Sequence, residues 1–495
     1  MRLRTILPTA FLLFFFTSSC VVQESPVTGT KRAYAYSWQQ EVELGKDVDS
    51  EIVSQFGLYD DPEVSEYFSE ISAVILENSH MRREDTPEKF RNTEFTFRVL
   101  DSPVVNAFAL PGGFVYVTRG LMAHLNNEAQ LAVVIGHEIG HVAARHASQR
   151  GLQQAIGQAV VVGGAIIGQE FLGVSGESIL NLSGQAAQLI FLSYSRDHER
   201  ESDRLGVEYA AMTGYDAAEG ADFFTSLKRL SEKSGGGVPN LLSSHPDPGE
   251  REETIPEKAE EWRQKGYEQS ILNKEEYMQL LDGMVFGENP RDGFERDGRF
   301  FHPNMEFQFP VPSGWNLINQ PSQVVMVSPE EKGVSIFRID GEAETARESV
   351  QNFLSNNEIE TDSQRSTQSS GRYDAYEADF TVQQESQTLG VHLYAVEYQG
   401  TVYTFLSYSA ESDFSEYLPI FKDTATNFDR LTDQSILNID PVTIRVTRTS
   451  GEEVFSRLLP DDLPMDIDEE EVAILNQVNL GDVIPAGTLI KIPVQ

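Results

Sequence analysis

The sequence predicts a multidomain protein: a mainly α-helical domain with a small β-sheet, then an α+β antiparallel sandwich, then a small third module. The length of 495 residues corresponds to about three domains at roughly 150 residues each. Apolar residues fall mostly at helical spacing as far as residue 282 and at strand spacing after residue 305. Residues 287–299 (GENPRDGFERDGR) are rich in glycine, charge and turn formers, and they separate the two patterns.

The composition is that of a folded, acidic protein. Hydrophobic residues make up 40% of the chain and aromatic residues 10%, which excludes a low-complexity or disordered class. The 38 Lys and Arg residues against 77 Asp and Glu residues give a formal net charge of −39. A protein that binds nucleic-acid phosphates needs the opposite sign, so we expect no nucleic-acid partner.

Residues 1–19 have the pattern of a signal peptide. A short basic start precedes an apolar stretch, residues 6–16, which is too short to span a bilayer, and small residues lead to Cys20, the single cysteine. The segment resembles a bacterial lipoprotein signal, which implies lipidation at Cys20 and membrane contact only through that anchor. Val21 in place of aspartate resembles outer-membrane sorting, so we expect a periplasmic protein anchored to the outer membrane of a Gram-negative bacterium. The alternative is an ordinary cleaved signal that leaves a free thiol.

The helical domain contains one strand-like interlude. Residues 93–100 alternate between apolar and polar positions, and residues 104–117 indicate two short strands around a Pro-Gly-Gly turn. The next segment, residues 127–147 (NEAQLAVVIGHEIGHVAARHA), has the spacing of a helix with Asn127 as its N-cap. Residues 155–168 are the most apolar later segment, but they fall short of the roughly 20 residues that span a membrane, and they predict a buried helix or flap.

The first of these helices carries a metal-binding pattern. His137 and His141 are four residues apart, so they share one helix face and their imidazoles can converge on one tetrahedral cation. Glu138 lies beside them, where its carboxylate can accept a proton from a metal-bound water without ligating the metal. Gly136 and Gly140 each weaken the helix by roughly 1 kcal/mol relative to alanine. We therefore expect a close approach there, either of substrate or of a packed neighbouring helix.

A catalytic zinc ion needs a third protein ligand, which this helix does not provide. The extended HExxHxxGxxH pattern is excluded, because Ala144 and Ala147 occupy its last two positions. His146 lies about 140° round the helix from His141, so we expect it to point away from the metal, in a structural or exposed position.

The best source of a third ligand is residues 195–206 (SRDHERESDRLG). On a helix, Glu199 and Asp203 share one face and Glu201 falls on the opposite one. One of the two carboxylates can ligate zinc while the other accepts a hydrogen bond from a ligating histidine. The spacing does not choose between them.

Four motifs occur in the order found in the M48 peptidase family, the Ste24-like and HtpX-like zinc metallopeptidases. They are NAFALPGGFVYVTRGL at residues 106–121, HEIGH at 137–141, SRDHERESD at 195–203 and SHP at 244–246. The resemblance implies a gluzincin-like peptidase domain over residues 20–286 with one zinc ion per chain. It selects Glu199 as the third ligand and Asp203 as a supporting residue. It also implies the soluble, exported branch, which is concerned with envelope protein quality control.

Three more residues are candidates for the site. His245 lies in a Ser-His-Pro turn, far along the chain from the other histidines. Its imidazole can donate to the oxyanion that forms at the attacked carbonyl, or it can close the open zinc position as a fourth, inhibitory ligand, and both roles remain open. Asn106 and Ala107 lie on a predicted edge strand before the active helix, where unpaired backbone groups can bind an extended substrate.

The second domain, residues 300–432, has the spacing of strands and two helices. Strands are predicted at residues 305–309, 323–327, 334–339, 373–382 and 391–408, the last as a hairpin that turns at Gln399 and Gly400, and helices at residues 346–355 and 414–428. The domain resembles a PsbP/Mog1-like sandwich, which implies substrate presentation or partner docking. The tail, residues 439–495, has strand-like ends around a helix-like middle and resembles a LysM-type module, which implies peptidoglycan as a partner.

These observations predict a zinc-dependent endopeptidase that hydrolyses misfolded or unassembled cell-envelope proteins. Zinc held by His137, His141 and Glu199 lowers the pKa of its water to about 7, Glu138 accepts the proton, and hydroxide attacks the peptide carbonyl. The alternative is a chaperone or scaffold that docks outer-membrane assembly machinery and rarely cuts. A third hypothesis, a peptidoglycan-associated hydrolase, rests on the tail alone.

Overall fold

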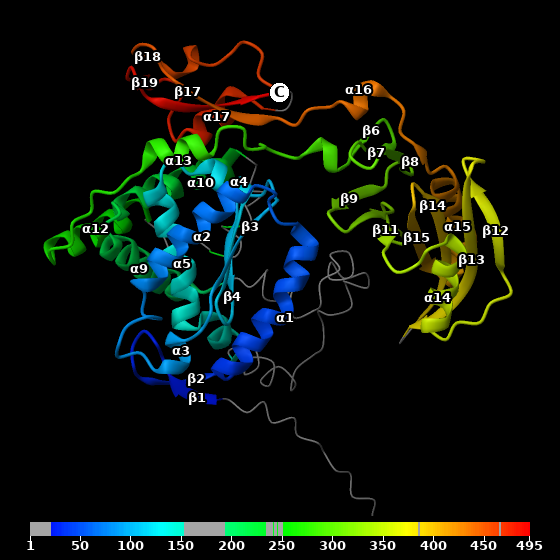
Figure 1. Ribbon diagram of the computed structural model, residues 1–495, viewed down its shortest axis with the longest axis horizontal. Coiled ribbons are helices and arrows are strands. Elements are labelled where there is room, and N and C mark those ends of the chain that lie inside the picture. The colour runs from blue at the N-terminus through cyan, green and yellow to red at the C-terminus, as the bar shows by residue number, and fades with distance from the viewer. Residues whose placement is uncertain are drawn as a thin grey trace, which may run out of the picture.

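The computed structural model describes residues 21–152, 194–233, 241, 245, 251–384, 387–464 and 467–495. Within them, a helical region, a β-rich region and a C-terminal region follow one another along the chain (Figure 1). The predicted signal peptide, the predicted lipidation site at Cys20 and the apolar segment at residues 155–168 lie outside the described residues. No helix in the described part of the chain is both long and apolar enough to cross a bilayer.

The helical region combines helices with a small sheet, as the spacing of its apolar residues predicts. Its elements are β1 (Val21–Glu24), β2 (Lys31–Tyr34), α1 (Trp38–Phe56), α2 (Pro62–Glu77), α3 (Glu88–Arg91), β3 (Thr96–Leu100), β4 (Ala107–Leu110), β5 (Phe114–Thr118), α4 (Arg119–His124), α5 (Glu128–Ala144), α9 (Arg196–Thr213), η1 (Ala217–Glu219), α10 (Gly220–Lys233), α12 (Arg251–Gln264) and α13 (Lys274–Leu280). The three-stranded sheet has the order β3-β5-β4, with β3 parallel and β4 antiparallel to β5. The strand β4 is therefore an edge of this sheet.

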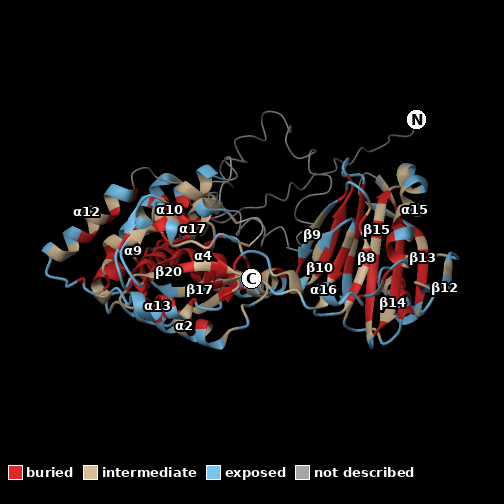
Figure 2. Cartoon of the chain, turned by 90° about the horizontal axis from the view of Figure 1, so that it is seen from above, coloured by how far each residue is buried: buried red, intermediate tan, exposed pale blue. Residues whose placement is uncertain are grey.

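Helix α5 lies at the centre of the helical region. The side chain of Asn127 accepts a hydrogen bond of 2.9 Å from the backbone N–H of Gln130, which is the cap that the sequence predicts. Every residue from Glu128 to Ala144 is buried, so this helix has no solvent-facing side. Figure 2 shows the buried residues gathered in two places, one among the helices and one in the sheets of the β-rich region.

The glycines of α5 allow α9 to pack against it at backbone distance. A Cβ atom added to Gly136 would lie 2.9 Å from the carbonyl oxygen of Gly206 on α9, and one added to Gly206 would lie 2.9 Å from the backbone nitrogen of His137. A Cβ atom on Gly140 would lie 3.1 Å from the Cβ of Leu205. The close approach that the sequence predicts is therefore made by a neighbouring helix. This contact brings the two helices that carry the predicted ligands together.

The β-rich region has a large antiparallel sheet at its centre. Its elements are η2 (Pro290–Asp292), β6 (Phe294–Arg296), β7 (Arg299–His302), β8 (Phe307–Pro310), β9 (Asn316–Gln320), β10 (Gln323–Val327), β11 (Gly333–Asp340), α14 (Ala346–Asn356), β12 (Gln364–Ser369), β13 (Tyr373–Gln384), β14 (Gln387–Tyr398), β15 (Thr401–Ala410), α15 (Glu411–Thr426) and β16 (Asp429–Arg430). The seven-stranded sheet has the order β12-β13-β14-β15-β11-β10-β9, and a second, four-stranded sheet has the order β16-β8-β7-β6.

Alternation along β14 distributes its side chains between two cores. Leu393 packs with residues of α14, whereas Tyr394 packs with α15 and with the aromatic residues of the four-stranded sheet. The predicted hairpin is present, because β14 and β15 pair on either side of Gln399 and Gly400, both at positive φ. The segment at residues 287–299, which the sequence predicts as a boundary, contains β6, so a strand of the β-rich region already begins there.

The C-terminal region docks on the helical region. Its elements are α16 (Gln434–Leu437), β17 (Thr443–Arg448), β18 (Glu453–Val454), η3 (Phe455–Arg457), α17 (Glu469–Leu475), β19 (Val483–Ile484) and β20 (Leu489–Val494). The fully buried Nζ of Lys491 donates hydrogen bonds to the carbonyl oxygens of Ala123 (2.5 Å) and Leu125 (2.9 Å), at the C-terminal end of α4. Figure 1 shows β17, β20 and α17 lying along α4, α10 and α13.

Candidate metal centre

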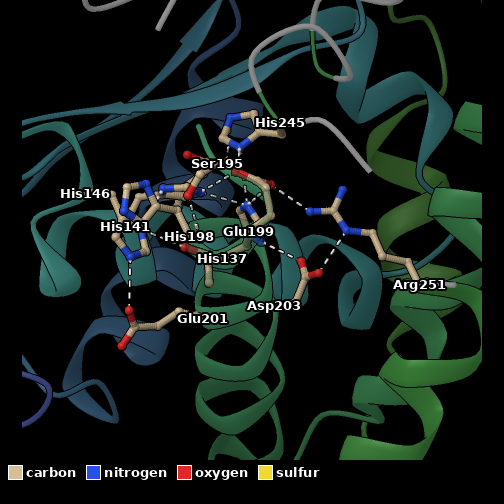
Figure 3. Close-up of polar contacts among 12 residues, drawn as sticks. His137, His141, His146, Ser195, His198, Glu199, Glu201, Asp203, His245 and Arg251 are labelled. Carbon is tan, nitrogen blue, oxygen red and sulfur yellow. Dashed lines mark hydrogen bonds and ion pairs between the residues drawn. The ribbon is translucent and has the colours of Figure 1, made fainter. Parts of the chain in front are cut away.

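Four buried side chains converge at the contact between α5 and α9. His137 and His141 come from α5, Glu199 comes from the first turn of α9, and His245 comes from a segment that precedes α12. One potential ligand atom from each lies within 4.8 Å of all the others. Figure 3 shows these side chains pointing toward one another.

The distances identify the atoms that face the centre. Nε2 of His141 lies 3.0 Å from Nε2 of His137, and each of these nitrogens lies 3.5 Å from an oxygen of Glu199. Nδ1 of His245 lies 3.3 Å from Nε2 of His137 and 3.4 Å from Oε1 of Glu199. Three imidazole nitrogens and one carboxylate are a donor set that zinc binds in proteins.

An ion-pair network lies behind His137. Nδ1 of His137 is 3.0 Å from Oδ1 of Asp203, and Arg251 donates from Nε to the other oxygen of Asp203 at 2.9 Å. Nη2 of the same arginine donates to Oε2 of Glu199 at 2.7 Å. Asp203 therefore lies behind the ring of His137, away from the centre, while Glu199 lies on the side of Nε2.

Charge and burial set the protonation of these groups. Burial alone would lower the pKa of His137, but the carboxylates of Asp203 and Glu199 outweigh it and raise that pKa to about 10. Burial lowers the pKa of His141 well below its usual value, so this imidazole is neutral. Although burial favours the protonated form of Glu199, the neighbouring histidines hold its pKa well below the usual range.

This protonation pattern is that of a site suited to a cation. Without a metal ion, a proton on His137 balances the charge of Glu199, and Oε1 of Glu199 has no hydrogen-bond partner although it is fully buried. A buried carboxylate oxygen without a donor is costly. A divalent cation among the four side chains would take the place of that proton and satisfy that oxygen, so the residues present fit the zinc ion that the sequence predicts.

Glu138 lies next to the centre with both carboxylate oxygens free of hydrogen bonds. The side chain is buried, and its Oε1 lies 3.7 Å from Nε2 of His245. Burial raises the pKa of this carboxyl group, which suits a base that accepts and then returns a proton. Glu138 thus lies beside the four side chains of the centre and is not one of them.

As the sequence predicts, His146 is not one of the side chains of the centre and has a structural position, but the structure places it directly behind His141. This residue is fully buried, and its Nδ1 lies 3.1 Å from Nδ1 of His141. The expectation assumed a continuous helix, but α5 ends at Ala144, and Arg145 has left-handed backbone dihedrals, with φ 61° and ψ 40°. The chain changes direction there, which brings the imidazole of His146 back onto His141.

Two residues at the site carry no signal that sequence reasoning used. Arg251 is 2% exposed although it is an arginine, and it balances two carboxylates from a helix about fifty residues away along the chain. The ring of Tyr194 lies over that of His141, with 4.1 Å between centroids. Neither shares a periodic pattern with the histidines, so only the folded contacts identify them.

The predicted substrate-binding residues lie at the start of the edge strand β4. The backbone of Asn106 exchanges hydrogen bonds with Thr118, and its side-chain Oδ1 is buried without a partner. Ala107 is the first residue of β4 and is fully buried. The pair therefore occupies a sheet edge in the same region as the metal centre, since β4 packs against α5.

Comparison with known proteins finds similarity in the helical region. Residues 70–259 match the profile of peptidase family M48. The beta-barrel assembly-enhancing protease of Yersinia pestis is 27% identical over 232 residues, which cover 46% of this chain and 45% of that protein. The mitochondrial metalloendopeptidase OMA1 of Arabidopsis thaliana is 32% identical over 157 residues, which cover 32% of this chain and 30% of that protein. The chain thus spans less than half the length of these relatives.

Two solved structures are similar to the chain at low identity. The solution structure of PsbP from a Synechocystis cyanobacterium has a TM-score of 0.23 and 14% identity, over 27% of this chain and 91% of that one. The Ran-binding protein Mog1p of Saccharomyces cerevisiae has a TM-score of 0.21 and 9% identity, over 28% of this chain and 96% of that one.

Proposed function

We propose that this chain, which carries a metallopeptidase domain of family M48, is a zinc-dependent endopeptidase that hydrolyses misfolded or unassembled cell-envelope proteins. The observation that carries the proposal is the convergence of two histidines of α5 with Glu199 of α9, while Glu138 stays free beside them. The domain bounds of residues 20–286, 300–432 and 439–495 are part of the same proposal.

In this proposal one zinc ion per chain is held by His137, His141 and Glu199, with His245 as a fourth ligand. When bound, zinc activates a water molecule and polarises the peptide carbonyl. Asp203 orients the ring of His137 from behind, and Arg251 holds Asp203 in place. The neutral state of His141 suits a ligand, which must offer a lone pair.

Glu138 moves the proton. Its carboxylate accepts a proton from the attacking water and returns it to the nitrogen of the leaving amine, so no covalent enzyme intermediate forms. The elevated pKa of Glu138 makes its carboxylate a stronger proton acceptor, and its lack of hydrogen-bond partners leaves both oxygens available.

His245 has the role of a gate in this proposal. With Nδ1 among the other ligand atoms it closes the position that water needs, so catalysis requires this imidazole to move aside. Once displaced, it can donate to the oxyanion through the same ring. Asn106 and Ala107, at the edge of the small sheet, would bind the substrate backbone in extended form.

The substrate class and the location rest on the relatives and on the start of the sequence. A relative named a beta-barrel assembly-enhancing protease supports outer-membrane β-barrel proteins that fail to assemble as substrates. The signal-like residues 1–19 and Cys20 support export and a lipid anchor at the outer membrane.

Glu138→Gln tests the proposal. The variant should bind zinc with the stoichiometry of the unchanged chain and should lose cleavage of an unfolded β-barrel protein by at least about 100-fold, because only the proton acceptor is removed. Retention of full cleavage would contradict the proposal.

The name of the same relative also supports a second function, assistance of β-barrel assembly without proteolysis. A strain in which the only copy of the protein is the Glu138→Gln variant distinguishes proteolysis from assistance of assembly. Normal assembly of outer-membrane proteins in that strain would favour the scaffold. Peptidoglycan binding by residues 439–495 stays a third proposal, which failure to sediment with purified sacculi would remove.

A further inference from the structure

We propose that His146 and Glu201 form a positioning relay that fixes the tautomer of His141 and thereby presents its Nε2 lone pair to the metal. The inference rests on the proposed function, because it needs His141 to be a ligand. It concerns residues beyond the ligand set: one lies past the end of α5, and the other lies on the face of α9 away from Asp203.

The two ring nitrogens of His141 face in opposite directions. Nε2 faces the centre, 3.0 Å from Nε2 of His137 and 3.5 Å from Oε1 of Glu199. Nδ1 faces away, 3.1 Å from Nδ1 of His146. A neutral imidazole that ligates through Nε2 carries its proton on Nδ1, so Nδ1 of His141 must be a donor.

That requirement assigns every proton along the relay. If Nδ1 of His141 donates, Nδ1 of His146 accepts, and the proton of His146 is then on Nε2. That nitrogen lies 3.3 Å from Oε2 of Glu201, a carboxylate oxygen that only accepts. The hydroxyl of Ser202 lies 3.3 Å from Nδ1 of His146, and as a donor it favours the same tautomer. The carboxylate of Glu201 thus favours the same tautomers that leave a lone pair on Nε2 of His141.

The backbone at Arg145 makes this geometry possible. A non-glycine residue in the left-handed region costs about 1–2 kcal/mol, so the surroundings must hold it there. The guanidinium of Arg145 donates to the buried carboxylate of Glu41 on α1 (2.6 Å and 3.0 Å) and to the carbonyl oxygen of Tyr36 (2.8 Å). It also stacks over the ring of Tyr34, 3.7 Å from its centroid. Contacts with residues 34–41 therefore hold the turn that returns His146 to the back of His141.

Figure 3 shows this relay and the Asp203–Arg251 network on opposite sides of the ligands. Glu201 is 24% exposed at its side chain, so the relay ends near solvent, whereas Arg251 is 2% exposed. His146 also stacks on His198, with 4.3 Å between the ring centroids. A purely structural role for His146 would rest on that stacking and on its volume, and the experiment below separates the two roles.

The test compares two variants of His146 in the purified chain. His146→Asn keeps an acceptor close to the position of Nδ1, whereas His146→Leu keeps much of the volume and has no acceptor. We expect the dissociation constant for zinc, measured by competition with a chromogenic chelator, to rise roughly 10-fold to 100-fold in His146→Leu. His146→Asn should recover most of that loss. His124→Leu, at a buried histidine that is not part of the centre, is the control and should bind zinc normally.

A spectroscopic measurement complements the zinc affinities and, like them, does not depend on catalytic activity. Co²⁺ titrated into each variant reports the ligand geometry through its visible absorption, and the spectrum of His146→Leu should differ from that of His146→Asn and of the unchanged chain. Equal zinc affinity and an unchanged cobalt spectrum in His146→Leu would overturn the relay. Equal losses in the leucine and asparagine variants would overturn it as well, because they would show that packing is what matters.

If His146→Leu does not fold, two variants of Glu201 test the relay instead. Glu201→Gln keeps an acceptor oxygen and should hold zinc almost normally, and Glu201→Leu should weaken it. Equal affinity in the two variants would overturn the relay. An unchanged chain that binds no zinc at all would instead contradict the proposed function itself, so the two failures are distinguishable.

Discussion

The two imidazoles that α5 contributes are supported in opposite ways. His137 has a carboxylate, Asp203, directly behind it, and Arg251 balances that charge. His141 has the imidazole of His146 behind it, on the side of Nδ1, and the carboxylate on that side, Glu201, lies beyond His146. Carboxylates raise the pKa of His137 to about 10, whereas burial lowers the pKa of His141. Two histidines one helical turn apart therefore differ because of the groups behind them, and the charged side should contribute more to stability.

We expect the largest effect from removal of the guanidinium group of Arg251, which lies on the His137 side. Arg251→Met leaves Asp203 and Glu199 buried without their partner, and breaking such a pair costs about 3–5 kcal/mol. We expect the free energy of unfolding of the metal-free chain to fall by that amount in urea denaturation. Glu201→Gln on the other side is the matched control and should change it by less than about 1 kcal/mol, because Glu201 is partly exposed. Equal losses would contradict the comparison.

Asp203→Asn reduces the difference between the two sides without removing the side chain. The amide oxygen can still face Nδ1 of His137, but the charge that raises the pKa of that histidine is lost. We expect zinc affinity to fall roughly 10-fold to 100-fold in chelator competition. In the metal-free chain, NMR titration should place the pKa of His137 below about 10. An unchanged titration would contradict the electrostatic account.

Gly206→Ala disturbs both sides together. Its Cβ would lie 2.9 Å from the backbone nitrogen of His137 and from the carbonyl oxygen of Val133, and neither backbone atom can move without shifting α5. We expect a loss of about 1–3 kcal/mol in the free energy of unfolding and weaker zinc binding. Gly151→Ala, whose Cβ would have only ordinary contacts, is the control. A stable Gly206→Ala chain with normal zinc affinity would show that the helix contact does not set the ligand positions.

The smallest effect concerns a histidine affected by burial without any carboxylate behind it. Burial lowers the pKa of His124 from 6.5 to about 4. Since the folded pKa lies below the unfolded one, this group stabilises the fold above pH 6.5, and that contribution is lost as the pH falls toward 4. We expect His124→Gln to reduce the loss of unfolding free energy between about pH 7 and pH 5 by about 1–2 kcal/mol. Identical pH profiles of the variant and the unchanged chain would contradict this.

The sequence predicts those parts of the site that depend on local spacing. The helix of His137 and His141, its Asn127 cap and the helix of Glu199 all follow from periodicity and capping chemistry. The hairpin at Gln399 and Gly400 follows from turn chemistry in the same way.

Features that depend on distant contacts could not be predicted. The return of His146 needs a left-handed residue at Arg145, which is held by Glu41 from a helix about a hundred residues earlier. The role of Arg251 needs the packing of α12 on α9. The polar strands β9 and β12 lack the apolar alternation that identifies a strand, and only their pairing with β10 and β13 reveals them.

The central claim is that one divalent ion is held between α5 and α9. Anomalous scattering at the zinc absorption edge, from crystals of the purified chain, tests it most directly. We predict one anomalous peak per chain, within bonding distance of Nε2 of His137, Nε2 of His141 and a carboxylate oxygen of Glu199. A peak elsewhere, or a zinc ion that Glu199 does not touch, would contradict the account.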